Sequence, residues 1–459
     1  MKNSDKTELF ETMPVPKAIT KLAVPTVVGC LVMVLYSLAD TYFVGMLNDP
    51  IQNAAVTLAA PIILLFNAVN NLFGVGGSSM MSRALGAKNY KLVKESSAFS
   101  FWGCIFSGLL FSLVMTMFKY PIMNLLGADS TTVQATGEYM FWTVTLGAIP
   151  SILNVVMGNL VRAEGCAMNA TIGSMSGCLL NIILDPVFIL PSMLNMGASG
   201  AGLATLISNT FACLYFFCFL WAKRGKTYVC IDINAFTLRR EVFIGVLGVG
   251  VPAAIQNMLN VTGMTILNNF TADFGSEAVA AMGIAHKTTM IPMYISMGIT
   301  QGVLPLIGYN FASGNKKRFK ESVLDTLYVG TAIIVVCTLA FFAGSKGIIR
   351  LFMENVNIVN YGGAFMKGMS LALPFLAIDF TVVGIFQACG MGKRSLIFAI
   401  LRKVVLEIPA LFVLNIIWPL YGLAYAQLFA EFVLAIASVL LIIKILKTME
   451  KEGIEETIQ

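Results

Sequence analysis

Long apolar runs alternate with short polar segments along the whole chain. A window of about 20 residues, the length that crosses a hydrocarbon layer of roughly 30 Å, finds twelve such runs. They cover residues 18–47, 54–79, 97–117, 139–160, 172–190, 198–221, 242–270, 278–306, 323–343, 363–386, 396–417 and 421–446. Lipid leaves no water for unpaired backbone groups, so runs of this length must be helices. The pattern predicts an all-α integral membrane protein with twelve transmembrane helices.

Composition agrees with a membrane protein. Hydrophobic residues make up 57% of the 459 positions and charged residues only 12%, which is too apolar for a soluble surface. The nine cysteines show no paired spacing and are interpreted as small hydrophobic residues. The first apolar run is longer than the core of a signal peptide and lacks a small-residue cleavage site, so we expect it to be the first helix.

Lysine and arginine are distributed unevenly between the predicted loops. If the N-terminus is cytoplasmic, only Lys119, Lys346, Arg350 and Lys367 fall outside, and Lys287 lies within a helix. The others, including four around the start of the eleventh helix, fall on the cytoplasmic side. This asymmetry predicts that both termini are cytoplasmic. The formal charge of +6 then reflects membrane orientation, and no nucleic-acid partner is expected.

The chain contains an internal duplication. NYKLVKES at residues 89–96 and NKKRFKES at 315–322 agree at five of eight positions, and each follows the second helix of its half. Pro25 and Pro252 occur early in the first helix of each half, and GLATLIS (202–208) resembles GLAYAQL (422–428). Chance similarity between lysine-rich loops would not explain these proline and glycine positions. We therefore predict two six-helix lobes, 1–222 and 241–459, joined by a cytoplasmic linker, 223–240, and related by a pseudo-two-fold axis along the membrane normal.

Four oxygen-bearing side chains share one predicted depth in the first lobe. Asp40, Asp185 and Thr205 lie on three helices at a similar level, and Asn181 precedes Asp185 by one helical turn. Two carboxylates close together in a low dielectric do not both stay charged, so a proton or cation is expected there. Hard oxygen donors favour Na⁺ or H⁺ over a transition metal. The alternative is that Asp40 caps its helix or faces water and that Asp185 opens a turn at Pro186.

The second half carries a different set of polar residues. They are Gln256, His286, Lys287, Asp379, Glu407 and Glu431, with Met290 nearby as a possible ligand contact. Lys287 either cancels the charge of one of these acids or contributes to substrate binding. His286, the only histidine, is more typical of a packing residue than of a proton relay. Met290, Met293 and Met297 fit a core, although a methionine-rich cleft suits varied apolar ligands.

Motifs of catalysis and nucleotide binding are missing from the sequence. We find no HExxH, GxSxG or GxxxxGK[ST], and too little sequence outside the predicted helices for a catalytic domain. The sequence therefore predicts neither an enzyme nor an ATP-driven pump, and no cofactor.

Several motifs resemble a known family. The segments ADTYFVG, SRALGAKNY, RAEGCAMNATIG, NIILDP and GASGAGLATLISN are similar to the multidrug and toxic compound extrusion (MATE) family, and IGYNFASGNKKR in the second half resembles its MepA-like bacterial branch. The resemblance covers nearly the whole chain. It implies a monomeric antiporter in the bacterial cytoplasmic membrane that exports small organic cations, drugs or toxic metabolites in exchange for Na⁺ or H⁺.

The resemblance also implies roles for particular residues. The cation site of prokaryotic members maps onto Asp40, Asn181, Asp185 and Thr205. Another branch carries an acid in its seventh helix, where this chain has Gln256, so the resemblance gives no support for an ion site there; Asp379 matches that branch's acid in the tenth helix. A related flippase or a dedicated exporter of a lipid-linked or peptide-type metabolite is the alternative, but such proteins tend to carry several cationic residues for anionic head groups.

Overall fold

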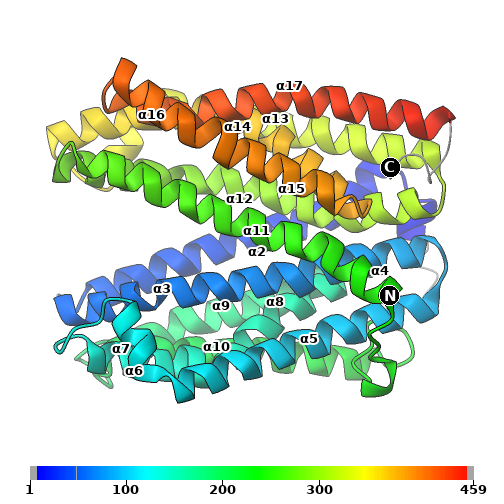
Figure 1. The fold of residues 1–459 in the computed structure, drawn as a ribbon, viewed down its shortest axis with the longest axis horizontal. Coiled ribbons are helices and arrows are strands. Elements are labelled where there is room, and N and C mark those ends of the chain that lie inside the picture. Colours follow the sequence, from blue (N-terminus) through cyan, green and yellow to red (C-terminus); the bar gives the residue numbers. More distant parts are fainter. Residues whose placement is uncertain (1–7, 48, 452–459) are drawn as a thin grey trace. The chain divides into compact units, whose positions relative to one another are not determined.

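The computed structural model describes residues 8–47 and 49–451 and shows helices joined by short loops, with no strand in that part of the chain (Figure 1). The first half contains α2 (Val15–Gly45), α3 (Pro50–Asn70), η1 (Asn71–Val75), α4 (Gly76–Gly86), α5 (Tyr90–Met117), α6 (Lys119–Leu125), α7 (Val133–Met140), η2 (Phe141–Leu146), α8 (Ala148–Ala163), α9 (Ala167–Ile189) and α10 (Gly197–Ala222). The second half contains η3 (Ile233–Ala235), α11 (Arg240–Ala272), α12 (Ser276–Ala312), α13 (Lys316–Arg350), α14 (Val356–Ala388), α15 (Gly392–Ile400), η4 (Leu401–Glu407), α16 (Ile408–Ile417) and α17 (Tyr421–Lys451).

Each predicted apolar run falls on helical residues, and the run 139–160 contains a break at Gly147. Among residues 8–47 and 49–451, ten helices can cross a membrane by length and composition, and eleven can if the pair 133–146 and 148–163, bent by 49°, is one span. The remaining predicted run, 396–417, falls on α15, η4 and α16. It does not pass the same test because it carries the charged residues Arg402, Lys403 and Glu407.

Three segments are π-helical: η1, η2 and η4. A π-helical turn accommodates an extra residue within an α-helical path and is frequent at functional sites. The hydropathy pattern gives no sign of it, because the apolar run continues through the turn.

The chain divides into two compact units. Of the described residues, unit 1 holds 8–9 and 31–254, and unit 2 holds 10–30 and 255–451. The division passes through α2 and through α11, each a few residues beyond its internal proline, Pro25 or Pro252. The lobes predicted from the duplication are divided at the linker instead and remain a prediction. The orientation predicted for the two termini concerns the extreme ends of the chain. These lie outside the described residues.

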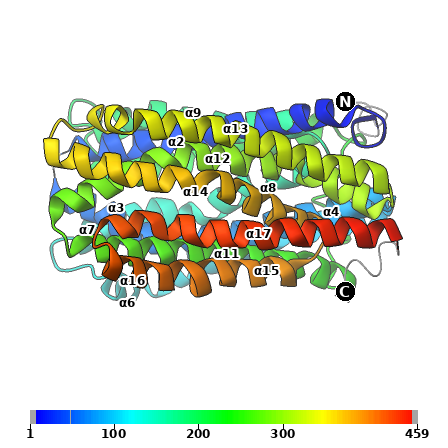
Figure 2. The same ribbon diagram turned by 90° about the horizontal axis from the view of Figure 1, so that it is seen from above.

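Unit 2 is organised around α14. This helix packs against α12, α13 and α17, which run alongside it in both views (Figures 1 and 2). Small residues permit the close approach: a Cβ added at Gly368 would lie 3.1 Å from the carbonyl oxygen of Ala424 in α17. Close contact through glycine and alanine is the usual way in which membrane helices associate.

In unit 1, glycines bring the first half of α11 against η1 and α4. A Cβ at Gly250 would lie 2.0 Å from the carbonyl oxygen of Leu72, and one at Gly76 would lie 2.3 Å from the carbonyl oxygen of Val246. These distances are too short for any side chain, so both positions require glycine.

The duplicated loop motif has a local structural explanation. Asn89 is the N-cap of α5, where its side chain accepts from the backbone N–H of Leu92 at 3.1 Å, and Asn315 caps α13 through Arg318 N, also at 3.1 Å. The asparagine that opens each copy therefore starts the third helix of its half.

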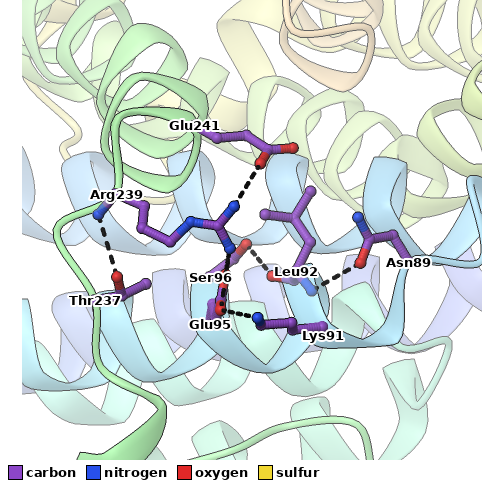
Figure 3. Close-up of polar contacts among 8 residues, drawn as sticks. All are labelled: Asn89, Lys91, Leu92, Glu95, Ser96, Thr237, Arg239 and Glu241. Atoms are coloured by element: carbon purple, nitrogen blue, oxygen red, sulfur yellow. Dashed lines mark hydrogen bonds and ion pairs between the residues drawn. The ribbon is translucent and has the colours of Figure 1, made fainter.

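Glu95, within the first copy, anchors the segment that precedes α11. Its carboxylate accepts from Arg239 at 3.2 Å and lies 3.9 Å from Lys91, while Arg239 also pairs with Glu241 (Figure 3). The predicted linker is held to unit 1 elsewhere as well, because Glu164 accepts from the backbone N–H of Tyr228 at 2.7 Å.

Candidate functional site

Asp40 lies within α2, five residues before the helix ends at Gly45, and is partly buried. It therefore does not cap this helix. Asp185 is fully buried in α9, which continues through Pro186 to Ile189. The turn proposed at Pro186 as an alternative is absent, so the capping role of Asp40 and the turn role of Asp185 are both excluded.

The structure brings the four predicted residues together in unit 1. Asp40 and Asp185 are close enough for one carboxylate to disfavour the charge of the other. Asn181 and Thr205, from α9 and α10, adjoin Asp185. In the amide orientation that matches donors with acceptors, Asn181 Nδ2 donates to the two Asp185 oxygens at 2.8 and 3.2 Å, and its Oδ1 accepts from the backbone N–H of Thr205 at 3.1 Å.

Two tyrosines that the sequence did not single out belong to the same group. Tyr36 lies one helical turn before Asp40, and its hydroxyl hydrogen-bonds the side chain of Thr205. Tyr139 of α7 is buried and lies near both Asp40 and Asp185. For Tyr36, its position one helical turn before Asp40 was a sequence signal that could have placed it at this site. Tyr139 is a single tyrosine in an apolar run and gave no such signal.

A chain of amides continues from this group along α10 and α8. Asn209 Nδ2 donates to the carbonyl oxygen of Thr205 at 3.0 Å and to Ser151 at 3.2 Å, and Asn154 donates to Asn209 Oδ1 at 3.1 Å. The hydrogen bonds between these polar side chains offset part of the free-energy cost of burying them.

The donor set is suited to H⁺ or a hard monovalent cation. Carboxylates, an amide and a hydroxyl are present, and no group of three or more His, Cys, Asp and Glu that could hold a metal occurs among residues 8–47 and 49–451. Asn181 turns its N–H toward Asp185 and its oxygen toward the α10 backbone. In this orientation it positions the carboxylate and is not itself a cation ligand.

A second buried polar group lies in unit 2. Asp379 and Glu431 are both fully buried, and Asp379 Oδ1 accepts from Ser438 at 2.6 Å. Glu431 forms an ion pair with Arg402 Nε at 3.1 Å. Lys403 Nζ donates to the two Glu407 oxygens at 2.7 and 2.6 Å.

The pairing considered for Lys287 is not found. Its side chain is exposed and has no ion pair with a described acid, and Glu407 and Glu431 pair with Lys403 and Arg402 instead. Those two basic residues were assigned to the cytoplasmic side with others around the start of the eleventh helix. The structure buries both of them in η4, and the side of the membrane assigned to them stays a prediction. Their position inside an apolar run was the signal that could have identified them.

The remaining candidates are dispersed within unit 2. Gln256 of α11 accepts from Gln387 at 3.3 Å. His286 is partly buried in α12 near Lys403 and Glu407, and Met290 follows it by one turn. We assign no ligand contact to Gln256 or Met290 on this geometry.

Comparison with known proteins gives concordant results. The family model MatE matches residues 25–187 and 252–413, one copy in each half. The multidrug export protein MepA of Staphylococcus aureus strain MRSA252 is 35% identical over 434 residues, which are 94% of each chain. The protein of the same name from Staphylococcus saprophyticus is 34% identical over the same length and coverage.

Solved structures resemble this fold over almost its full length. One, an outward-facing multidrug resistance MATE family transporter of the MOP superfamily, aligns with a TM-score of 0.91 and 25% identity over 97% of this chain and 99% of the other. A MOP superfamily transporter from Pyrococcus furiosus, described as having a binding pocket of reverse polarity, aligns with a TM-score of 0.89 and 25% identity over 97% and 98% of the chains.

Proposed function

The chain belongs to the MatE family of multi-pass membrane transporters, and from this premise we propose that it exports small organic cations across the bacterial cytoplasmic membrane in exchange for H⁺ or Na⁺. The family consists of transport proteins that need no cofactor, so the enzyme considered as an alternative is set aside. Export of several compounds follows the name multidrug export protein that its staphylococcal relatives carry.

The observation that carries the coupling proposal is the group of Asp40, Asp185, Asn181 and Thr205. Two carboxylates share a poorly hydrated space, and neither has a basic residue among its described hydrogen-bond or ion-pair partners. Such a pair takes up a positive charge readily. Binding of H⁺ or Na⁺ then neutralises the pair, and α2 repacks against α9 and α10, so that the bound substrate is released outside.

The orientation of Asn181 separates the two ions. With its N–H on Asp185 and its oxygen on the α10 backbone, the amide presents no oxygen to a metal ion, whereas a proton on a carboxylate needs no such ligand. Sodium would require the amide to turn and present its oxygen. We therefore propose H⁺ as the ion for the arrangement described here.

The buried basic residues of unit 2 give no support for an anionic substrate. Arg402 and Lys403 are each neutralised by an acid, so neither offers a free positive charge to a phosphate or carboxylate head group. This argues against the flippase alternative, whose substrates carry such groups.

Reconstituted proteoliposomes test the proposal. Vesicles loaded with a fluorescent organic cation are given a pH gradient, a Na⁺ gradient or neither, and efflux is followed with wild type and with Asp40→Asn/Asp185→Asn. We expect efflux that depends on the pH gradient in wild type and its loss in the double variant. Efflux without any gradient, or undiminished efflux by the double variant, would contradict the coupling proposal.

A further inference from the structure

Lys403 and Glu407 form an ion pair inside the η4 segment of unit 2. The ammonium donates to both carboxylate oxygens at 2.6–2.7 Å, and each side chain is 9% exposed. The residues are four apart, on one face of the segment. In the part of the chain that the structure describes, each has its only hydrogen-bond and ion-pair partner in the other.

The neighbouring pair is held differently. Arg402 pairs with Glu431, donates to Asn260 of α11 at 3.2 Å and lies 5.0 Å from the centroid of the Phe380 ring. Glu431 is fully buried. Arg402 thus connects η4 to α11, α14 and α17 and stabilises their packing. The Lys403–Glu407 pair lies within η4 and connects it to no other element by a hydrogen bond or ion pair among the described residues.

A glycine of α11 allows close packing against this pair. Gly263 of α11 faces it, and a Cβ there would lie 3.3 Å from Lys403 Cδ and 3.4 Å from both Lys403 Nζ and Glu407 Oε1. His286 of α12 is near enough for both charges to act on it, and its buried Nδ1 has no hydrogen-bond partner among the described residues. The pair therefore packs closely against the α11 backbone, and His286 lies within electrostatic range of both charges.

Stability alone does not account for this pair. Burial of two charges is costly, and well-packed apolar residues of similar volume are often equally or more stabilising. Ionisable residues within membrane helices are typical of functional sites, and π-helical turns are frequent at such sites. A carboxylate whose two oxygens contact one ammonium also already has the arrangement that an alkylammonium ligand needs.

We propose that Glu407 binds the cationic group of exported substrates and that Lys403 occupies this carboxylate between transport cycles. The inference rests on the proposed export of organic cations and identifies where unit 2 recognises them. A substrate must displace the Lys403 ammonium to bind, so the lysine excludes small or weakly held cations. Selectivity then depends on the competition between an internal and an external cation for one carboxylate.

Binding of radiolabelled octylammonium, a primary alkylammonium ion, to the purified full-length protein tests this inference. Lys403→Met removes the competitor, and we expect affinity to rise about tenfold. Glu407→Gln and the neutral double variant Lys403→Met/Glu407→Gln should each lose at least about tenfold in affinity. Lys346→Met, which removes an exposed lysine far along the chain, should bind like wild type.

The double variant distinguishes binding from structure. If the pair is only structural, neutralising both charges together restores wild-type binding, and that result would overturn the inference. Melting temperatures of all variants are measured in parallel, and a loss of affinity is attributed to the binding site only where Tm is unchanged. If Lys403→Met has a lower Tm than wild type, the binding affinity of the double variant, which contains no unpaired charge, decides between a binding and a structural role.

Failure of the inference is distinguishable from failure of the proposed function. A double variant that binds and exports the cation normally refutes the role of Glu407 but leaves cation export intact. A wild-type protein that neither binds the cation nor exports it under any ion gradient refutes both.

Discussion

Asn181 is the residue whose contacts say most about the coupling site. Its Nδ2 donates to both oxygens of Asp185, and its Oδ1 is held by the α10 backbone at Thr205. A hydrogen bond to a charged group contributes about 1.5–3 kcal/mol. Loss of these contacts should therefore weaken the charged form of Asp185 relative to the protonated form.

We predict that Asn181→Ala retains export but changes its dependence on protons. Because the ionised carboxylate loses its donor, Asp185 should hold its proton to higher external pH, and the pH of half-maximal efflux should rise by about one unit or more. Efflux from proteoliposomes at a series of pH values measures this shift. Asn67→Ala, at an exposed position of α3, serves as the control, and an unshifted profile for Asn181→Ala would mean that the amide does not act on Asp185.

Sequence reasoning at the residue scale identified acids but not their aromatic neighbours. Asp40, Asp185, Asn181 and Thr205 were recognised because polar groups are costly inside an apolar run. Tyr36 and Tyr139 join the same group, but tyrosine is amphipathic and common in membrane helices, so their presence carried no comparable signal. Whether the four predicted residues couple transport stays a prediction.

At the scale of elements, the contact of α11 with η1 and α4 depends on particular glycines. A methyl group at Gly250 would overlap the carbonyl of Leu72 at 2.0 Å, whereas one at Gly248 would meet only Ile244 Cγ2 of its own helix, at 4.0 Å. We predict that Gly250→Ala destabilises the protein by about 1–3 kcal/mol and lowers Tm by several degrees. Gly248→Ala should leave Tm equal or slightly higher, because alanine favours the helix. Equal melting temperatures of the two variants in detergent would contradict the close contact.

The duplicated loops make a second prediction at this scale. Asn89 and Asn315 cap α5 and α13 through equivalent hydrogen bonds, so Asn89→Ala and Asn315→Ala should each cost about 0.5–2 kcal/mol. Substitution by aspartate or serine, which also accept from the backbone, should recover most of this loss. Thermal unfolding of the four single variants and of wild type provides the comparison. If alanine and serine behave alike, the repeat is not explained by capping.

Helix positions could be predicted from the sequence, and their interruptions could not. Every predicted apolar run falls on a helical stretch because burial in lipid forces backbone hydrogen bonds within the segment. The π-helical turns η1, η2 and η4 depend on side-chain packing between helices, which a single sequence does not reveal. The same is true of α2 and α11, whose first and second halves belong to different compact units.

At the scale of the whole molecule, the distribution of lysine and arginine predicts orientation. We expect Lys91→Cys and Lys320→Cys to react with a membrane-impermeant maleimide only after the cytoplasmic side is opened, and Lys119→Cys and Lys346→Cys to react in intact cells. The native cysteines are first replaced by alanine or serine, since Cys218 is exposed. Labelling of all four positions from one side would refute the predicted topology.

The charge balance of one transport cycle decides whether membrane voltage drives export. One elementary charge that crosses 100 mV gains about 2.3 kcal/mol, which corresponds to roughly a fiftyfold concentration ratio. Asp40 and Asp185 can together take up one or two protons. One proton exchanged for a monovalent cation moves no net charge, while two protons move one charge inward.

Because Asn181 stabilises the ionised form of Asp185, we expect single protonation and hence export that responds to the pH gradient but not to voltage. A potassium diffusion potential of about 100 mV, imposed on proteoliposomes with valinomycin at equal pH on both sides, should leave the efflux of a monovalent cation unchanged. Faster efflux when the direction of the potential favours proton movement would instead show that both carboxylates are protonated in each cycle.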